Sequence, residues 1–217
     1  MIKQIRLGII SVGSDPHLLK NLKKQIEATP VWKCNVQHAL MLVGYLTAPP
    51  AQASFHLQWA WMRYEPAIDQ SSPLLKLQPA WSDVDPHQKT ILADDFGMSF
   101  TCQYLMENFG FEAFANTTQV LDIVFPAKTG LKKVAANGAA KSPDFFAIDS
   151  MNQVHILECK GSQVSCERVE RAMRKGVAQK NNVKGLSKFA SCMVGGLYVP
   201  LAGSAEDALL RSTSPHI

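Results

Sequence analysis

Two apolar segments separated by three turn residues constrain the fold of this chain more than any other feature. The first reads DFFAID over residues 144–149, the second reads QVHILECK over residues 153–160, and Ser150-Met151-Asn152 joins them. Apolar runs of this length on either side of a short loop are typical of a β-hairpin. Because FFAI and VHIL leave little room for a solvated side, we expect both faces of the hairpin to be buried.

The length of the loop determines which residues face one another across the hairpin. With a three-residue loop, Asp149 lies opposite Gln153, and continuing this pairing places Asp144 opposite Glu158. Directly opposed residues point to the same face with Cβ atoms ~5 Å apart. Lys160, two residues beyond Glu158, points to that face as well. A loop one residue longer or shorter would shift the register and separate these groups.

Two carboxylates and one ammonium group that converge on an otherwise apolar hairpin indicate a binding or catalytic site. Neighbouring carboxylates raise each other's pKa, and a divalent cation with oxygen ligands relieves the repulsion. The backbone carbonyl of Cys159 could supply a third ligand, and Lys160 could orient a water or stabilise negative charge on a phosphate. Asp144, Glu158 and Lys160 around Mg²⁺, or Mn²⁺ in its place, suit attack of water on a phosphodiester.

Simpler interpretations of these residues stay open from the sequence. Asp144 and Glu158 could be solvated charges on an edge hairpin, and Lys160 could do no more than pair with a carboxylate. His155 and Cys159 fall on the opposite face, where we expect both side chains to pack in the core.

The pattern of Pro143-Asp144, thirteen intervening residues and Glu158-Cys159-Lys160 resembles the signature of the PD-(D/E)XK nuclease superfamily. That superfamily includes restriction endonucleases, junction resolvases and recombination exonucleases. The resemblance implies a restriction-endonuclease-like fold, an α/β mixed-sheet sandwich whose core runs helix, strand, strand, strand, helix, strand. It also implies that the Asp and the Glu bind the metal and that the Lys is catalytic.

The same resemblance implies two further contributions from helices. The helix after the ExK strand often adds a polar residue, for which Gln179 is the best match, although it could equally be a surface amide. The first helix often adds an acidic metal ligand. Asp94, Asp95 and Glu107 are candidates, with Asp95 preferred because it lies near the start of that helix.

The elements expected from residue 90 onward follow the same order. Apolar residues at helical spacing predict a helix that ends at Gly110. A hairpin followed by a crossover helix and one more strand predicts a mixed sheet. The expected elements are a helix over 91–109, a strand over 111–115, a helical turn over 120–125, an exposed loop over 129–141, the hairpin, a helix over 166–184 and a strand over 191–199.

Residues 1–89 differ in composition from residues 90–217, and we predict an accessory region followed by a nuclease-like domain. The first segment holds all four tryptophans and eight of the twelve prolines. A homodimer or a partner subunit would be contacted through this segment. Its expected elements are a strand over 5–12, a helix over 16–28 with Asp15 as its N-cap, a helix over 37–46 and irregular structure with short elements over 48–90.

Composition limits the compartment and the partners. The formal net charge is +4 and the pI is near 8.8, which is compatible with a nucleic-acid partner. Five scattered cysteines without a C-x-x-C pair argue against a zinc knuckle or a disulfide framework. The apolar runs are too short for a signal peptide or a membrane span. We therefore predict a cytoplasmic protein with no membrane partner.

The predicted function is that of a Mg²⁺-dependent deoxyribonuclease, with host defence or DNA processing as the setting that the resemblance implies. RNA as the substrate is one alternative, and a catalytically silent nuclease-fold subunit that binds nucleic acid in a larger complex is the other. A solvated surface is the default for the basic residues around the hairpin. Those that could track a nucleic-acid backbone are Lys141, Arg171, Lys175 and Lys180.

Overall fold

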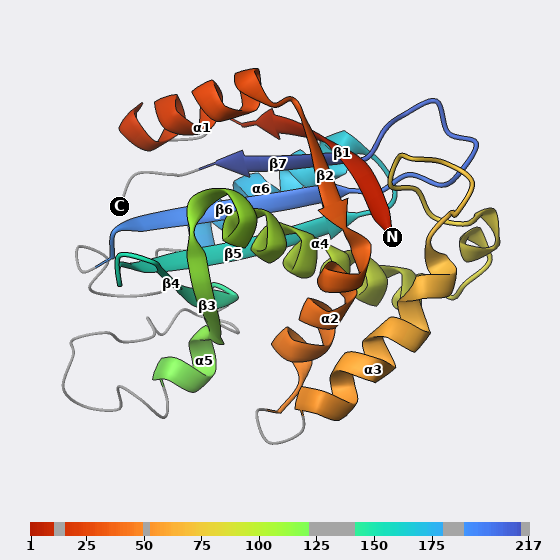
Figure 1. Cartoon of the computed structure of the whole chain (residues 1–217), viewed down its shortest axis with the longest axis horizontal. Coiled ribbons are helices and arrows are strands. Elements are labelled where there is room, and N and C mark those ends of the chain that lie inside the picture. Colours follow the sequence, from red (N-terminus) through yellow and green to blue (C-terminus); the bar gives the residue numbers. More distant parts are fainter. Residues whose placement is uncertain (11–15, 50–52, 122–141, 180–188, 214–217) are drawn as a thin grey trace.

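The structure is a computed structural model that describes residues 1–10, 16–49, 53–121, 142–179 and 189–213 (Figure 1). In this part of the chain, seven strands form one mixed sheet, which confirms the predicted α/β class. The strands are β1 (Ile2–Ile9), β2 (Val31–Asn35), β3 (Phe111–Asn116), β4 (Phe145–Asp149), β5 (Val154–Ser162), β6 (Ser191–Tyr198) and β7 (Leu209–Thr213). The helices are α1 (Pro16–Ala28), α2 (Val36–Thr47), α3 (Ala53–Tyr64), α4 (Pro86–Phe109), α5 (Thr117–Gln119) and α6 (Cys166–Gln179), with 3-10 turns η2 (Glu65–Ala67) and η3 (Pro79–Ser82).

The strand order across the sheet is β2-β1-β7-β6-β5-β4-β3. β5 pairs with β6 and β1 pairs with β7 in parallel, and the other neighbouring pairs are antiparallel. The parallel β5–β6 pair requires a crossover connection, which α6 provides. The predicted sequence of hairpin, crossover helix and returning strand is therefore present.

Helices cover both faces of the sheet, as Figure 1 shows for α4 and α6. Successive residues of β6 display the two layers. Met193 belongs to a buried cluster with Leu105 of α4, whereas Val194 belongs to another with Met173 of α6. Since side chains alternate between faces along a strand, α4 and α6 lie on opposite sides of the sheet.

The long helix α4 packs directly on the backbone of β5. Asp85 caps its start by accepting from the amide of His87, and Gly110 ends it with a φ of 68°, as predicted. A Cβ at Gly97 would lie 2.5 Å from the Lys160 carbonyl oxygen, and one at Gly161 would lie 1.7 Å from the Ala93 carbonyl oxygen. Glycine at both places is what allows the helix to lie against the strand beside Lys160.

The hairpin of β4 and β5 has the predicted loop and register. Pairs run from Phe145 opposite Leu157 to Ile148 opposite Val154, and the Asp149 amide donates to the Gln153 carbonyl at 3.1 Å. The loop closes with Asn152 in a left-handed conformation at a φ of 59°, which is the usual ending of a three-residue hairpin loop.

Residues 1–89 share the sheet and a core with the rest of the chain. β1 lies between β2 and β7, and α2 and α3 pack together beside α4. One buried cluster contains Ile5 and Tyr64 from the first segment and Phe96 and Leu210 from the second. The segment predicted as an accessory region thus contributes two strands at one edge of the sheet.

Several elements differ from expectation, among them β2, which was not predicted and pairs with β1. Residues 53–64 form a helix of 12 residues inside the segment predicted to be irregular with short elements. Pro49, Pro50 and Pro66 flank this stretch and leave it free to form a helix. The short strand β7 was not predicted, and it joins the sheet by pairing with both β1 and β6. Within the described residues, no helix has the length and hydropathy of a membrane span. Asp15, the loop 129–141, residues 122–125 and the end of the helix predicted over 166–184 lie outside the described residues.

Candidate active site

Asp144 lies at the point where the hairpin opens. It immediately precedes β4, and its Oδ2 accepts a hydrogen bond from the Cys159 amide at 2.7 Å. Continuing the β4–β5 register by one residue pairs Asp144 with Glu158. The side chain of Asp144 is therefore tied to the strand that carries Glu158 and Lys160.

Pro143 explains why the ladder stops at this point. Continuing the register by another residue pairs it with Cys159, and proline has no amide hydrogen to donate. The amide and carbonyl of a strand residue face the same neighbouring strand. Because the Cys159 amide points to Asp144, its carbonyl faces the same opening. The Cys159 thiol lies on the other side, buried in the core with residues of α4, as predicted.

Glu158 is the most deeply buried member of the group, with 2% of its surface exposed. Its Oε1 accepts a hydrogen bond from Lys160 Nζ. Its Oε2 has no hydrogen-bond partner among the described residues. A Cβ at Gly176 of α6 would lie 3.0 Å from Glu158 Cγ and 3.5 Å from Lys160 Cε, so α6 covers this face of the hairpin.

The charges of the three side chains act strongly on one another. Burial and the nearby Asp144 raise the pKa of Glu158 to about 7, even though Lys160 acts to lower it. The pKa of Asp144 is also raised, chiefly by burial. Burial alone would lower the pKa of Lys160, but the two carboxylates outweigh it and raise that pKa. The group therefore combines a charged lysine, bonded to Glu158, with two carboxylates whose pKa values are raised.

The first-helix acid near this group is Asp94 and not the preferred Asp95. Asp95 is buried, and its carboxylate accepts a hydrogen bond from the Tyr64 hydroxyl. Asp94 is exposed, and its charge contributes to the raised pKa of Asp144. The signal that separates the two is helical spacing, because Asp95 shares the buried stripe of Leu92 and Phe96.

The basic candidates fall into two groups. Arg171 and Lys175 are exposed on the outer side of α6, where together with Arg168 and Arg174 they line a shallow groove of about 620 Å³. Gln179 is the last residue of α6, and its side chain lies outside the described part of the structure, as do Lys141 and Lys180.

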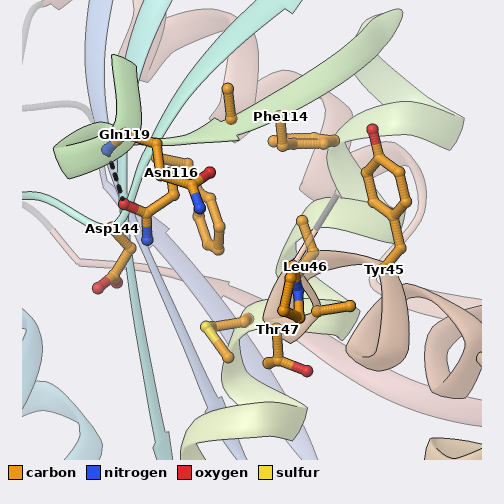
Figure 2. Close-up of a pocket in the computed structure, with 12 residues that line it drawn as sticks. Tyr45, Leu46, Thr47, Phe114, Asn116, Gln119 and Asp144 are labelled. Atoms are coloured by element: carbon orange, nitrogen blue, oxygen red, sulfur yellow. Dashed lines mark hydrogen bonds between the residues drawn. The ribbon is translucent and has the colours of Figure 1, made fainter. Parts of the chain in front are cut away.

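A cleft of about 730 Å³ lies beside Asp144, which lines one end of it. Figure 2 shows Asp144, Asn116 and Gln119 at this end and Tyr45 and Phe114 at the other. These side chains come from α2, β3, α5 and the residue before β4, which are far apart in the sequence. Spacing along the sequence could not have revealed this cleft.

Few groups in the described residues suit a metal ion. No cluster there holds three or more His, Cys, Asp or Glu side chains. Asp144 and Glu158 offer two carboxylates, and the Cys159 carbonyl faces the same opening. Mg²⁺ usually takes one or two carboxylates and keeps several waters, so a set of this size suits it.

Comparison with known proteins gives no relative. No family model matches the chain, and neither does any curated protein or solved structure.

Proposed function

We propose that this protein is a Mg²⁺-dependent nuclease that hydrolyses DNA phosphodiester bonds, with a restriction-endonuclease-like core. One observation carries the proposal. Glu158 Oε2 is buried without a hydrogen-bond partner among the described residues, next to a second carboxylate and a lysine. Burying a carboxylate oxygen without a partner lowers the free energy of unfolding by roughly several kcal/mol. A cation bound to this oxygen would remove that destabilisation.

The donor set fits the ion that the proposal requires. Asp144 and Glu158 would hold Mg²⁺ through hard carboxylate oxygens, with the Cys159 carbonyl on the same edge. The bound ion would polarise a phosphoryl oxygen and lower the pKa of a coordinated water. Mn²⁺ prefers the same ligands and would substitute.

The residues of the chain supply the remaining parts of the reaction. Lys160 keeps its proton because two carboxylates raise its pKa, so its ammonium can stabilise negative charge that develops on the phosphate. Glu158 fixes the position of this ammonium by accepting its hydrogen bond. Arg171 and Lys175 on the exposed side of α6 would contact neighbouring phosphates.

Cleavage of plasmid and linear DNA in Mg²⁺ or Mn²⁺ tests the proposal. We expect activity that requires the metal and is lost in Glu158→Ala and Lys160→Ala. Asp149→Asn is the matched control, because Asp149 is a buried carboxylate of the same hairpin outside this group. Wild-type activity in both Ala variants, or no cleavage by the wild type with either ion, would show that the proposal is wrong.

RNA of the same sequence belongs in the same assay. Faster cleavage of the RNA would overturn the assignment to DNA, while the dependence on Glu158 and Lys160 would identify the same site.

A further inference from the structure

We propose that the cleft beside Asp144 binds an unstacked nucleobase, so that the substrate is single-stranded DNA or DNA with an unpaired nucleotide. The inference rests on the proposed nuclease function and specifies its substrate class.

The position of the cleft is the first argument. Asp144 belongs to the cleft and also to the carboxylate pair. A phosphate held at Asp144 would therefore lie at one end of the cleft. Since one sugar separates a phosphate from its base, the base of the adjoining nucleotide would reach the cleft interior.

The lining suits the flat face of a base. Leu46, Met98, Phe114 and Phe145 form an apolar wall, and Phe114 and Phe145 are themselves largely buried. Tyr45 is 51% exposed at the rim, on the same side as Phe114 (Figure 2). Proteins that bind unstacked bases commonly place them against aromatic side chains in this way.

The polar side of the cleft suits the edge of a base. Asn116 Oδ1 accepts hydrogen bonds from the Thr118 amide at 2.9 Å and the Gln119 amide at 3.3 Å. These bonds cap α5 and hold the side chain in place, which leaves the Asn116 Nδ2 group as a fixed donor. The exposed amide of Gln119 adds a second polar group next to it. An oriented donor of this kind suits a ring nitrogen or carbonyl oxygen of a base.

The charge of the cleft lining favours a base, and not a phosphate backbone, as the group that the cleft binds. Asp144 is the one charged side chain among the described residues that line the cleft. Binding to a duplex through its phosphates requires Lys and Arg, and in the described residues such side chains gather on α6. A base inside a duplex stack cannot turn its face into a cleft, so the occupant must be unstacked.

Binding in EDTA tests the inference separately from catalysis. The probe is a short fluorescein-labelled single-stranded DNA, with its duplex as competitor, and the readout is fluorescence anisotropy. We expect Tyr45→Ala to raise the dissociation constant about tenfold through lost stacking and Asn116→Ala to raise it about fivefold. Phe55→Ala is the matched control, because Phe55 is an aromatic residue of α3 that is 70% exposed and outside the cleft.

The outcomes separate the two proposals. Selective weakening in the Tyr45 and Asn116 variants, with tighter binding of the single strand than of the duplex, supports the inference. Equal binding by all variants, or tighter binding of the duplex, overturns it. If the single strand binds selectively and yet no DNA is cleaved in Mg²⁺ or Mn²⁺, the inference is supported and the nuclease proposal fails.

Discussion

The hairpin of β4 and β5 carries a buried polar group near each end, and the two groups differ in how their hydrogen bonds are satisfied. The loop-end cluster consists of Asp149, His155 and Ser191. His155 bonds Ser191 Oγ through Nδ1 at 2.7 Å and Asp149 Oδ2 through Nε2 at 3.1 Å. Its place in the core agrees with the sequence-based prediction. The open-end cluster consists of Asp144, Glu158 and Lys160.

The hydrogen bonds of the loop-end cluster are satisfied within the cluster and by the loop amides. Asp149 Oδ1 accepts from the Met151 and Gln153 amides at 3.0 and 2.8 Å. Although burial acts to raise it, these bonds and the contact with His155 hold the pKa of Asp149 below its usual value. The open-end cluster has a carboxylate oxygen without a partner in the described structure and a Glu158 pKa of about 7.

The difference in hydrogen bonding shows how similar residue types can stabilise the fold at one end of a hairpin and form a binding site at the other. A satisfied buried network rigidifies its surroundings, and here it ties the hairpin loop to β5 and β6. An unsatisfied buried carboxylate destabilises the fold unless another group binds it, and such groups occur where proteins bind ligands. We therefore interpret the loop-end cluster as structural and the open-end cluster as functional.

The largest expected effect is on activity at the open end. Glu158→Gln removes a negative charge and a cation ligand at nearly constant shape, so we expect kcat to fall about a thousandfold while circular dichroism stays native. Plasmid cleavage under single-turnover conditions measures this. A loss below about threefold would place the chemistry elsewhere in the molecule.

The second effect is on stability at the loop end. His155→Ala leaves Asp149 and Ser191 without their shared partner and opens a cavity, which should lower the free energy of unfolding by about 2–4 kcal/mol. Urea denaturation measures it. Cleavage per folded molecule should remain within about twofold of wild type. A large loss of kcat in a folded variant would contradict the division between the two clusters.

The third effect is the pH dependence of stability. The pKa of Glu158 is about 7 in the folded protein, above its usual value of 4.5, so the folded state binds the proton more tightly than the unfolded state does. The stability linked to this proton is present at low pH and is lost as pH rises through about 7. Without metal, Glu158→Gln should exceed wild type in stability at pH 8, by on the order of 2–3 kcal/mol. The gain should fade as pH approaches the unfolded pKa.

Urea denaturation in EDTA at pH 8 and pH 5 measures this gain. Asp149→Asn is the control and should show the opposite sign at pH 8, because the folded-state pKa of Asp149 is lowered. A Glu158→Gln variant less stable than wild type at pH 8 would contradict the electrostatic account.

The smallest effect comes from the helix that covers the open end. The added Cβ of Gly176→Ala would press on Glu158 Cγ at 3.0 Å and on Val194 Cγ1 at 3.3 Å. We expect kcat to fall several-fold, on the order of 1 kcal/mol, with little loss of stability since alanine favours the helix. Gly8→Ala is the control, because its Cβ would make ordinary contacts with Arg211 at 3.4 Å. Equal activity of the two variants would show that α6 does not position Glu158.

Local patterns predicted the hairpin correctly because alternation and loop length together determine a register. The pairing of Phe145 with Leu157 follows from a three-residue loop, and the position of Asp144 follows from that pairing. Gly110 likewise ends α4 because a left-handed residue is needed there.

Tertiary packing determined the features that the sequence did not reveal. Helical spacing places Asp95 on the buried stripe of α4, but the hydrogen bond that occupies its carboxylate comes from Tyr64 of α3, an element that was itself not predicted. The cleft combines Tyr45, Asn116 and Asp144 from distant segments. The strand β7 is short, and its place between β1 and β6 depends on pairings that no local pattern encodes.

Crystals soaked in Mn²⁺ would test the central claim most directly, through an anomalous difference map. We predict a peak within about 2.0–2.6 Å of carboxylate oxygens from both Asp144 and Glu158, and no such peak in Glu158→Gln crystals. A map of the wild type without a peak between these carboxylates, in crystals of protein that cleaves DNA with Mn²⁺, would contradict the account.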